Sequence, residues 1–215
     1  MKIITTTRAL GFVAALSLAT VAQATPLQLL TADFETGLAG WTERDPLNPS
    51  GLVVADPLSS GHGQVLTFQR VGSSGTLFTS APLVSPSGMF TLTFDYLGLA
   101  KQGSVAGDLG GYIGVVNGID GAGKWIGGTG AQVTPLNLID DGQWHSYSYS
   151  FTSEWGNSLR VMIEDWDGSG RTFGDAYFDN IGFVANVPEP TSLALVGLAL
   201  AAVGACSKRR KVQSA

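Results

Sequence analysis

The sequence predicts an all-β protein whose central body, residues 25–186, is a two-sheet β-sandwich, most consistent with a jelly roll. Three observations lead to this prediction. Short runs of alternating apolar residues recur between clusters of Gly, Pro, Asp and Ser, glycine makes up 29 of 215 residues, and the body shows no sustained helical periodicity. Short strands at this spacing are typical of sandwiches and barrels.

The strands are predicted from the alternation of their side chains. In Phe90–Leu97, the side chains of Leu92, Phe94 and Tyr96 share one face, while threonines and an aspartate occupy the other. The expected strands are Gln64–Val71, Gly75–Ser80, Phe90–Leu97, Gly111–Val116, Lys124–Gly127, Trp144–Thr152, Ser158–Asp165 and Ala176–Val184.

The first 24 residues have the pattern of a secretory signal peptide. Lys2 and Arg8 form a basic start, residues 9–21 are mostly apolar, and Ala22-Gln23-Ala24 is a small-x-small cleavage site. We expect export by the Sec machinery and cleavage after Ala24.

The C-terminal segment, residues 187–211, predicts a single membrane-spanning helix. No residue from Thr191 to Ser207 is charged, and such a helix spans about 25 Å, slightly less than the roughly 30 Å of a hydrocarbon core. The four basic residues that follow hold that end in the cytoplasm. Two prolines before the segment favour an extended, protease-accessible strip. The residues of this tripartite pattern are Val187, Pro188, Glu189, Pro190, Lys208, Arg209, Arg210 and Lys211.

This tail resembles the PEP-CTERM sorting signal of Gram-negative bacteria that secrete exopolysaccharide. The resemblance implies that an exosortase recognises the Pro-Glu-Pro strip and removes the helix. The protein would then pass through an inner-membrane intermediate to the cell surface or the extracellular matrix of a biofilm. The alternative is a plain single-span anchor.

The charge of the body excludes some classes of partner. Residues 25–186 contain six Lys or Arg and sixteen Asp or Glu, a net charge of about −10. A body this acidic argues against nucleic acid or anionic lipid as a partner. The only cysteine, Cys206, lies in the tail, so the body has no disulfide.

Three segments of the body resemble galactose-binding-like jelly-roll carbohydrate-binding modules. Asp33–Gly37 with Trp41 is similar to their first strand, and Tyr177–Ile181 is similar to their last. Asp141–Tyr147 is similar to a strand start that these modules share with laminin-G-like sandwiches. The resemblance implies a sandwich that binds polysaccharide.

Tryptophans in or beside Gly-rich loops are the candidate glycan platforms, because a flat ring can stack on the C–H groups of a sugar. These are Trp125, Trp155 and Trp166, whereas Trp41 and Trp144 stand at strand starts and are expected to close the core. A further aromatic row, Tyr147, Tyr149 and Phe151, lies on one strand face and is either core or an exposed platform.

Two calcium sites are candidates. Asp165, Asp167 and Ser169, followed by Gly170, supply oxygens at the alternate positions that open a calcium loop. An EF-hand would need a glutamate where Ala176 stands, so the alternatives are a β-loop calcium site and an ordinary turn.

The second candidate comes from the resemblance to binding modules, in which a structural calcium often joins the first and last strands. The matching residues are Glu35, or Asp33, and Asp179. The alternative is that the first two cap a turn or are solvated, and that Asp179 bonds the backbone.

Signals of catalysis are poor. The body has two histidines and no cysteine, and it lacks a Gly-x-Ser-x-Gly elbow and a His-Glu-x-x-His helix. Glu164, Asp165 and Asp167 lack the spacing of the paired carboxylates of jelly-roll glucanases. We therefore expect a non-catalytic protein that binds exopolysaccharide; the alternatives are a purely structural surface protein and, less favoured, a glycan-degrading enzyme.

Overall fold

The computed structural model describes residues 26–69, 76–83, 88–99, 108–129, 134–167, 175–186 and 197. The chain divides into two units, Pro26–Val187 and the two terminal segments Met1–Thr25 and Pro188–Ala215. All the strands and both hydrophobic clusters of the described residues lie within Pro26–Val187. This segment therefore has a complete core of its own.

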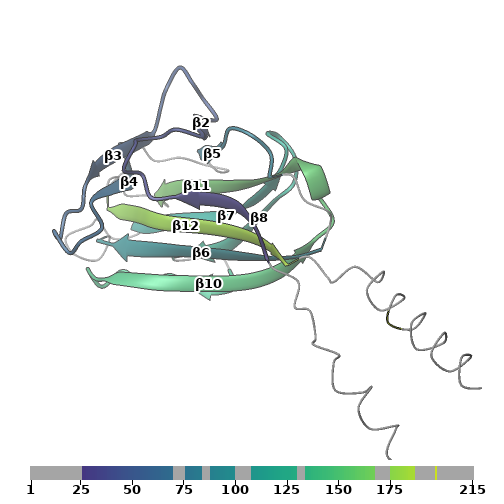
Figure 1. Ribbon diagram of the computed structural model, residues 1–215. Coiled ribbons are helices and arrows are strands. Elements are labelled where there is room, and N and C mark those ends of the chain that lie inside the picture. Colours follow the sequence, from purple (N-terminus) through teal and green to yellow (C-terminus); the bar gives the residue numbers. More distant parts are fainter. Residues whose placement is uncertain are drawn as a thin grey trace, which may run out of the picture. The chain divides into compact units, whose positions relative to one another are not determined.

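Pro26–Val187 is a two-sheet sandwich (Figure 1). Sheet 1 has the strand order β10-β6-β12-β4-β3, with β1 also pairing with β12. Its strands are β1 (Leu27–Ala32), β3 (Gly51–Ala55), β4 (Gln64–Phe68), β6 (Gly88–Gly98), β10 (Trp144–Ser153) and β12 (Ala176–Asn186). Sheet 2 has the order β2-β5-β11-β7-β8-β9. Its strands are β2 (Trp41–Glu43), β5 (Leu77–Thr79), β7 (Asp108–Asn117), β8 (Gly123–Gly128), β9 (Leu136–Asn137) and β11 (Leu159–Asp167).

The core lies between the sheets and follows from the alternation along each strand. In β6 the side chains of Phe90, Leu92, Phe94 and Tyr96 are at most 1% exposed, and they pack against rings of β10 and β12. Full burial of a Phe or Leu side chain stabilises the fold by about 1.5–3 kcal/mol, so this row alone specifies which face of β6 points inward.

All eight expected strands are present within a few residues, which confirms the predicted two-sheet sandwich. The aromatic row of β10 belongs to the core, because Phe151 is buried and Tyr147 and Tyr149 pack against the main cluster. Trp41 is also in the core, as predicted. Trp144 is not: it is partly buried and lies outside both hydrophobic clusters.

The expected first strand at Asp33–Gly37 is wrong. The first strand is β1, and Asp33–Gly37 forms the turn that follows it. Phe34 in this turn has a φ of 56° and is 2% exposed, and the N–H of Gly37 bonds its carbonyl. The motif places a core ring at a sharp corner, which a strand would not do. No helix within the described ranges is long and apolar enough to span a membrane, and the expected C-terminal helix lies outside those ranges apart from residue 197.

Candidate functional site

The outer face of sheet 2 carries a second hydrophobic cluster, separate from the main core. It consists of Phe78, Val116 and Met162, each at most 3% exposed, with the partly buried Trp125 packed against them. The strand register explains why they meet. Trp125 in β8 lies opposite Gly114 in β7, Gly114 lies opposite Met162 in β11, and Met162 lies opposite Phe78 in β5.

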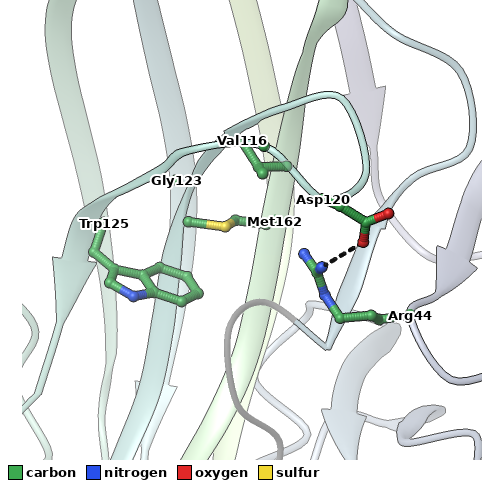
Figure 2. A pocket seen from close by; sticks show the side chains of 7 residues that line it. Arg44, Val116, Asp120, Gly123, Trp125 and Met162 are labelled. Carbon is green, nitrogen blue, oxygen red and sulfur yellow. Dashed lines mark hydrogen bonds and ion pairs between the residues drawn. The ribbon is translucent and has the colours of Figure 1, made fainter.

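A groove of about 420 Å³ lies along this face, within the usual range for ligand sites. Figure 2 shows Trp125 at one end, Arg44 with Asp120 at the other, and Met162 and Val116 between them. The described residues that line the groove are Arg44, Val116, Asp120, Gly121, Gly123, Trp125 and Met162. One end of the groove is therefore aromatic and the other is charged.

The indole of Trp125 packs against a buried ring on the same face of sheet 2. Tyr112, which is fully buried, packs its ring against the indole at a centroid distance of 5.7 Å and an interplanar angle of 61°, and its hydroxyl donates to the carbonyl of Thr129. Edge-to-face pairs of this kind stabilise by about 0.5–1.5 kcal/mol beyond the area they bury. The indole is thus a positioned surface, not a freely rotating side chain.

Gly123 lines the groove, and Gly114 pairs with Trp125 across β7 and β8 beside it. A Cβ added to Gly114 would lie 2.3 Å from the carbonyl oxygen of Lys124 and 2.9 Å from the Cα of Trp125. A Cβ on Gly123 would approach the Cε of Met162 to 3.0 Å. At Gly114 the contact is with backbone, which cannot move aside without shifting β8, so close pairing of β7 and β8 requires glycine there.

Two of the few cations of the body lie over the Phe78 ring, Arg44 at the charged end of the groove and Arg160 outside its lining. The guanidinium groups of Arg44 and Arg160 each lie 5.7 Å from the centroid of the Phe78 ring. Arg44 Nη1 is also 3.5 Å from Oδ1 of Asp120, whose side chain is 90% exposed. An ion pair this exposed contributes little to stability. Both partners can therefore serve a ligand as hydrogen-bond donor and acceptor.

The three predicted tryptophans do not gather in one place. By alternation along β11, Trp166 shares the outer face of sheet 2 with Met162 and is partly buried. Trp155 precedes the short helix η1 (Gly156–Ser158) and packs against the main core. There it lines a separate hollow of about 200 Å³ with Lys124 and Phe151.

The sequence did not indicate four residues that line or support the groove, Arg44, Asp120, Phe78 and Met162. Arg44 and Asp120 are 76 positions apart, and only the pairing of β2, β5, β11 and β7 brings them together. Alternation along β11 could have placed Met162 on the outer face, because its neighbour Val161 faces the core. It could not have shown which of the outward-facing side chains are covered by other side chains.

The predicted calcium ligands Glu35 and Asp179 lie near one turn. Oε1 of Glu35 accepts the N–H of Gln64 at 2.9 Å, and Oδ2 of Asp179 is 2.8 Å from Nδ1 of His62. Oδ1 of Asp179 is buried and has no partner within hydrogen-bond geometry; burial raises the pKa of this carboxyl, although His62 and the backbone N–H of Asn180 oppose the shift. An orphaned carboxylate oxygen suits a cation.

The described residues supply only part of a calcium shell. No three His, Cys, Asp or Glu side chains among them form a group that could hold a metal ion. Asp33 instead accepts the N–H of Glu35 at 3.3 Å, in line with a turn-capping role. Asp165 of the other candidate loop is fully buried, while Ser169 and the side chain of Asp167 lie outside the described part of the chain.

A network that the sequence did not suggest joins β10 to the loop before β4. The ring of His62 stacks on the indole of Trp144 with 4.0 Å between the ring centroids. The indole N–H of Trp144 donates to Oδ1 of Asp56 at 3.1 Å. Burial acts to raise the pKa of Asp56, but hydrogen bonds from Leu58, Ser60 and Trp144 hold it well below the usual carboxyl value. Trp144 therefore anchors a loop and does not close the core.

Comparison with known proteins identifies the tail. Residues 186–210 match the model of the PEP-CTERM protein-sorting motif. The chain carries a PEP-CTERM sorting signal. The signal implies an exported protein that has a C-terminal membrane anchor before processing. A comparison with curated proteins found no match.

Solved structures share the fold of the body. One is the CBM22-1 and GH10 modules of endo-1,4-β-D-xylanase 10B from Clostridium thermocellum, complexed with xylohexaose, with a TM-score of 0.51 and 11% identity over 77% of this chain and 30% of that one. Another is the K1 cleaved adhesin domain of Lys-gingipain from Porphyromonas gingivalis W83, with a TM-score of 0.50 and 15% identity over 76% of this chain and all, 100%, of that one. At this identity the likeness shows the fold alone.

Proposed function

We propose that this exported protein binds polysaccharide in the groove on the outer face of sheet 2 and does not transform it. The observation that supports the proposal best is the indole of Trp125, backed by the buried Tyr112 and placed at one end of a groove whose other end holds Arg44 and Asp120. Such a groove offers a ring for the apolar face of a sugar and charged groups for its hydroxyls.

The size and openness of the groove set the strength of binding. A sugar stacked on one ring releases little water, and association costs several kcal/mol of lost motion. We expect a dissociation constant of about 10⁻⁵ to 10⁻³ M for each groove. Asp120 is the only carboxylate among the described lining residues, whereas glycosidases use two. The residues that line the groove thus support binding in preference to hydrolysis.

Affinity electrophoresis tests this proposal. Residues 26–187 are run through gels that contain exopolysaccharide from the producing bacterium, with xylan and dextran as comparison polymers. We expect retardation of the wild type, loss of about tenfold or more in affinity for Trp125→Ala, and a smaller loss for Arg44→Ala.

Trp155→Ala is the matched control, since Trp155 is also partly buried but lines the other hollow. Loss of retardation with Trp155→Ala alone would move the site to that hollow. No retardation of the wild type on any of the gels would favour a purely structural protein, and release of reducing sugar would favour an enzyme.

We also propose that calcium binds between Glu35 and Asp179 and stabilises the body. Two observations support this site. Oδ1 of Asp179 is buried without a partner in hydrogen-bond geometry, and the carboxylate of Glu35 lies against Gly63, the neighbour of His62, whose ring contacts Asp179. Backbone carbonyls would supply the remaining oxygens that calcium needs. Binding to the folded state alone at 100 times the dissociation constant adds about 2.7 kcal/mol.

Processing follows from the two terminal signals. We propose that the mature protein lacks residues 1–24 and that an exosortase removes the segment after the Pro-Glu-Pro strip. Intact-mass measurement of the exported protein from its producing cell checks both cuts. A mature species that retains Lys208–Lys211 would contradict the second.

A further inference from the structure

Strand β10 is the long edge of the sandwich. Among the described strands it pairs with β6 alone, and it does so over ten consecutive residue pairs from Trp144 to Ser153. The edges at the far ends of the two strand orders are shorter: β3 has 5 residues, β2 has 3 and β9 has 2. Figure 1 shows β10 as the lowest strand of the sandwich, running its full width. It therefore presents the longest row of edge N–H and C=O groups.

Strand β10 itself lacks the features by which proteins usually prevent strands from pairing with other chains, and the charge beside it is Lys124 of β8, whose ammonium lies over the Phe151 ring. Residues 144–153 contain no Asp, Glu, Lys, Arg or Pro, although the body as a whole carries about −10. The pairing with β6 shows no bulge or register shift. Natural edges are normally blunted by charges, proline or bulges, so an uncharged and regular edge of this length is open to strand addition.

The side chains on both faces of the edge are suited to a partner strand. Ser146, Ser148 and Ser150 are exposed on the outer face of sheet 1, and Tyr149 is only partly buried on the inner face. A hollow of about 320 Å³ follows the edge, lined by Met89, Lys124, Tyr149, Ser150, Phe151 and Thr152. Met89 is 51% exposed, so apolar surface remains beside the open backbone.

We infer that β10 pairs antiparallel with β10 of a second copy of this chain, so that two sandwiches share one continuous sheet. A two-fold axis perpendicular to the sheet maps the edge onto itself and keeps the inner faces on the same side. Any such register places even-numbered residues opposite even-numbered ones. With the axis at Tyr149, Ser148 faces Ser150 and Tyr147 faces Phe151, pairings that are favourable across strands.

The strand chemistry favours a second copy over an unrelated partner. Ten residues on each edge would form about ten backbone hydrogen bonds, as many as a typical protein interface contains. The body is acidic as a whole, but residues 144–153 themselves carry no acidic side chain that would repel the same strand of a second copy. The dimer would also complete the burial of Tyr147 and Tyr149 from both copies.

The dimer has a geometric consequence for the proposed glycan groove. Because the axis is perpendicular to sheet 1, sheet 2 of both copies lies on the same side, and the two grooves face in one direction. If the groove binds glycan as proposed, one polymer chain can contact both copies, which raises the apparent affinity without any new contact.

Charged substitutions in β10 test the inference. Sedimentation equilibrium of residues 26–187 should give twice the monomer mass for the wild type. The variants Ser148→Lys/Ser150→Lys and Ser148→Glu/Ser150→Glu place like charges opposite each other in a two-fold pair, and each should weaken the dimer about tenfold or more. An equimolar mixture of the two variants should restore the dimer mass.

A matched control adds the same charge elsewhere. Leu47→Lys/Leu58→Lys, at positions 88% and 44% exposed, should leave the dimer unchanged. Far-ultraviolet circular dichroism and thermal melting check that each variant is folded. A wild type that stays monomeric up to near-millimolar concentration overturns the inference, and so does a dimer that the edge charges leave intact or that the mixture does not restore. These readouts do not depend on glycan binding.

Discussion

The close pairing of β7 and β8 beneath Trp125 makes Gly114→Ala the most informative single substitution. The added methyl would lie 2.3 Å from the carbonyl oxygen of Lys124, a backbone atom, so β8 must shift away from β7. Overpacking of this kind costs about 1–3 kcal/mol of folding free energy. For a domain of this size, that corresponds to a fall of about 2–12 °C in the melting temperature.

The control is Gly88→Ala at the start of β6, where an added Cβ meets nothing within 4 Å and the backbone has no positive φ. This change should leave stability unchanged or raise it slightly, because alanine restricts the unfolded chain. Thermal and urea unfolding of both variants of residues 26–187 measure the difference. If Gly114→Ala were as stable as Gly88→Ala, the claim that close pairing of β7 and β8 requires glycine at position 114 would be refuted. If it unfolded earlier but kept full affinity for polysaccharide, the link between β8 and the position of Trp125 would fail.

Three other perturbations have defined outcomes. Tyr96→Phe removes a buried hydroxyl that donates to Asp140 and accepts the N–H of Gly111, and should lower the unfolding free energy by about 1–3 kcal/mol in urea titrations. Asp56→Asn should lower stability near neutral pH. The folded-state pKa of Asp56 is depressed, so its contribution is present above the unfolded value of 3.8 and is lost as pH falls below it; a pH-independent difference between variant and wild type would contradict this assignment. Millimolar calcium should raise the melting temperature of the wild type over that in chelator but not that of Asp179→Ala, and equal shifts in both proteins would reject the proposed site.

The sequence indicated the strands that carry a clear apolar alternation or stand between turn residues, and it did not indicate β1, β2, β3 or β9. Alternation in β6 and β10 places large aromatic residues on one face, and burial of those residues leaves no choice of register. β2, with three residues, and β9, with two, are too short for any periodicity to be detected. Their place in sheet 2 comes from pairing with strands far away in the chain.

The candidate site was only partly predictable for the same reason. A tryptophan in a Gly-rich segment pointed to Trp125, and its ring does line the groove. Arg44 follows a three-residue strand and Asp120 lies in a turn, so neither carries a local signal. Trp144 was assigned to the core because it begins a strand, yet its indole N–H bonds Asp56 and its ring stacks on His62. The sequence around a tryptophan does not show which polar group its indole N–H will bond when the two residues are far apart in the chain.

The indole N–H signals of the five tryptophans provide the most direct test of the central claim, that the groove on sheet 2 binds polysaccharide. In nitrogen-15 NMR spectra of residues 26–187, Trp125→Phe assigns the Trp125 signal. Titration with oligosaccharides from the exopolysaccharide of the producing bacterium should shift this signal in a saturable manner. The signals of Trp41 in the core and Trp144 on its Asp56 partner should stay in place. A Trp125 signal that does not move while another tryptophan shifts, or no shift at saturating oligosaccharide, would contradict the account.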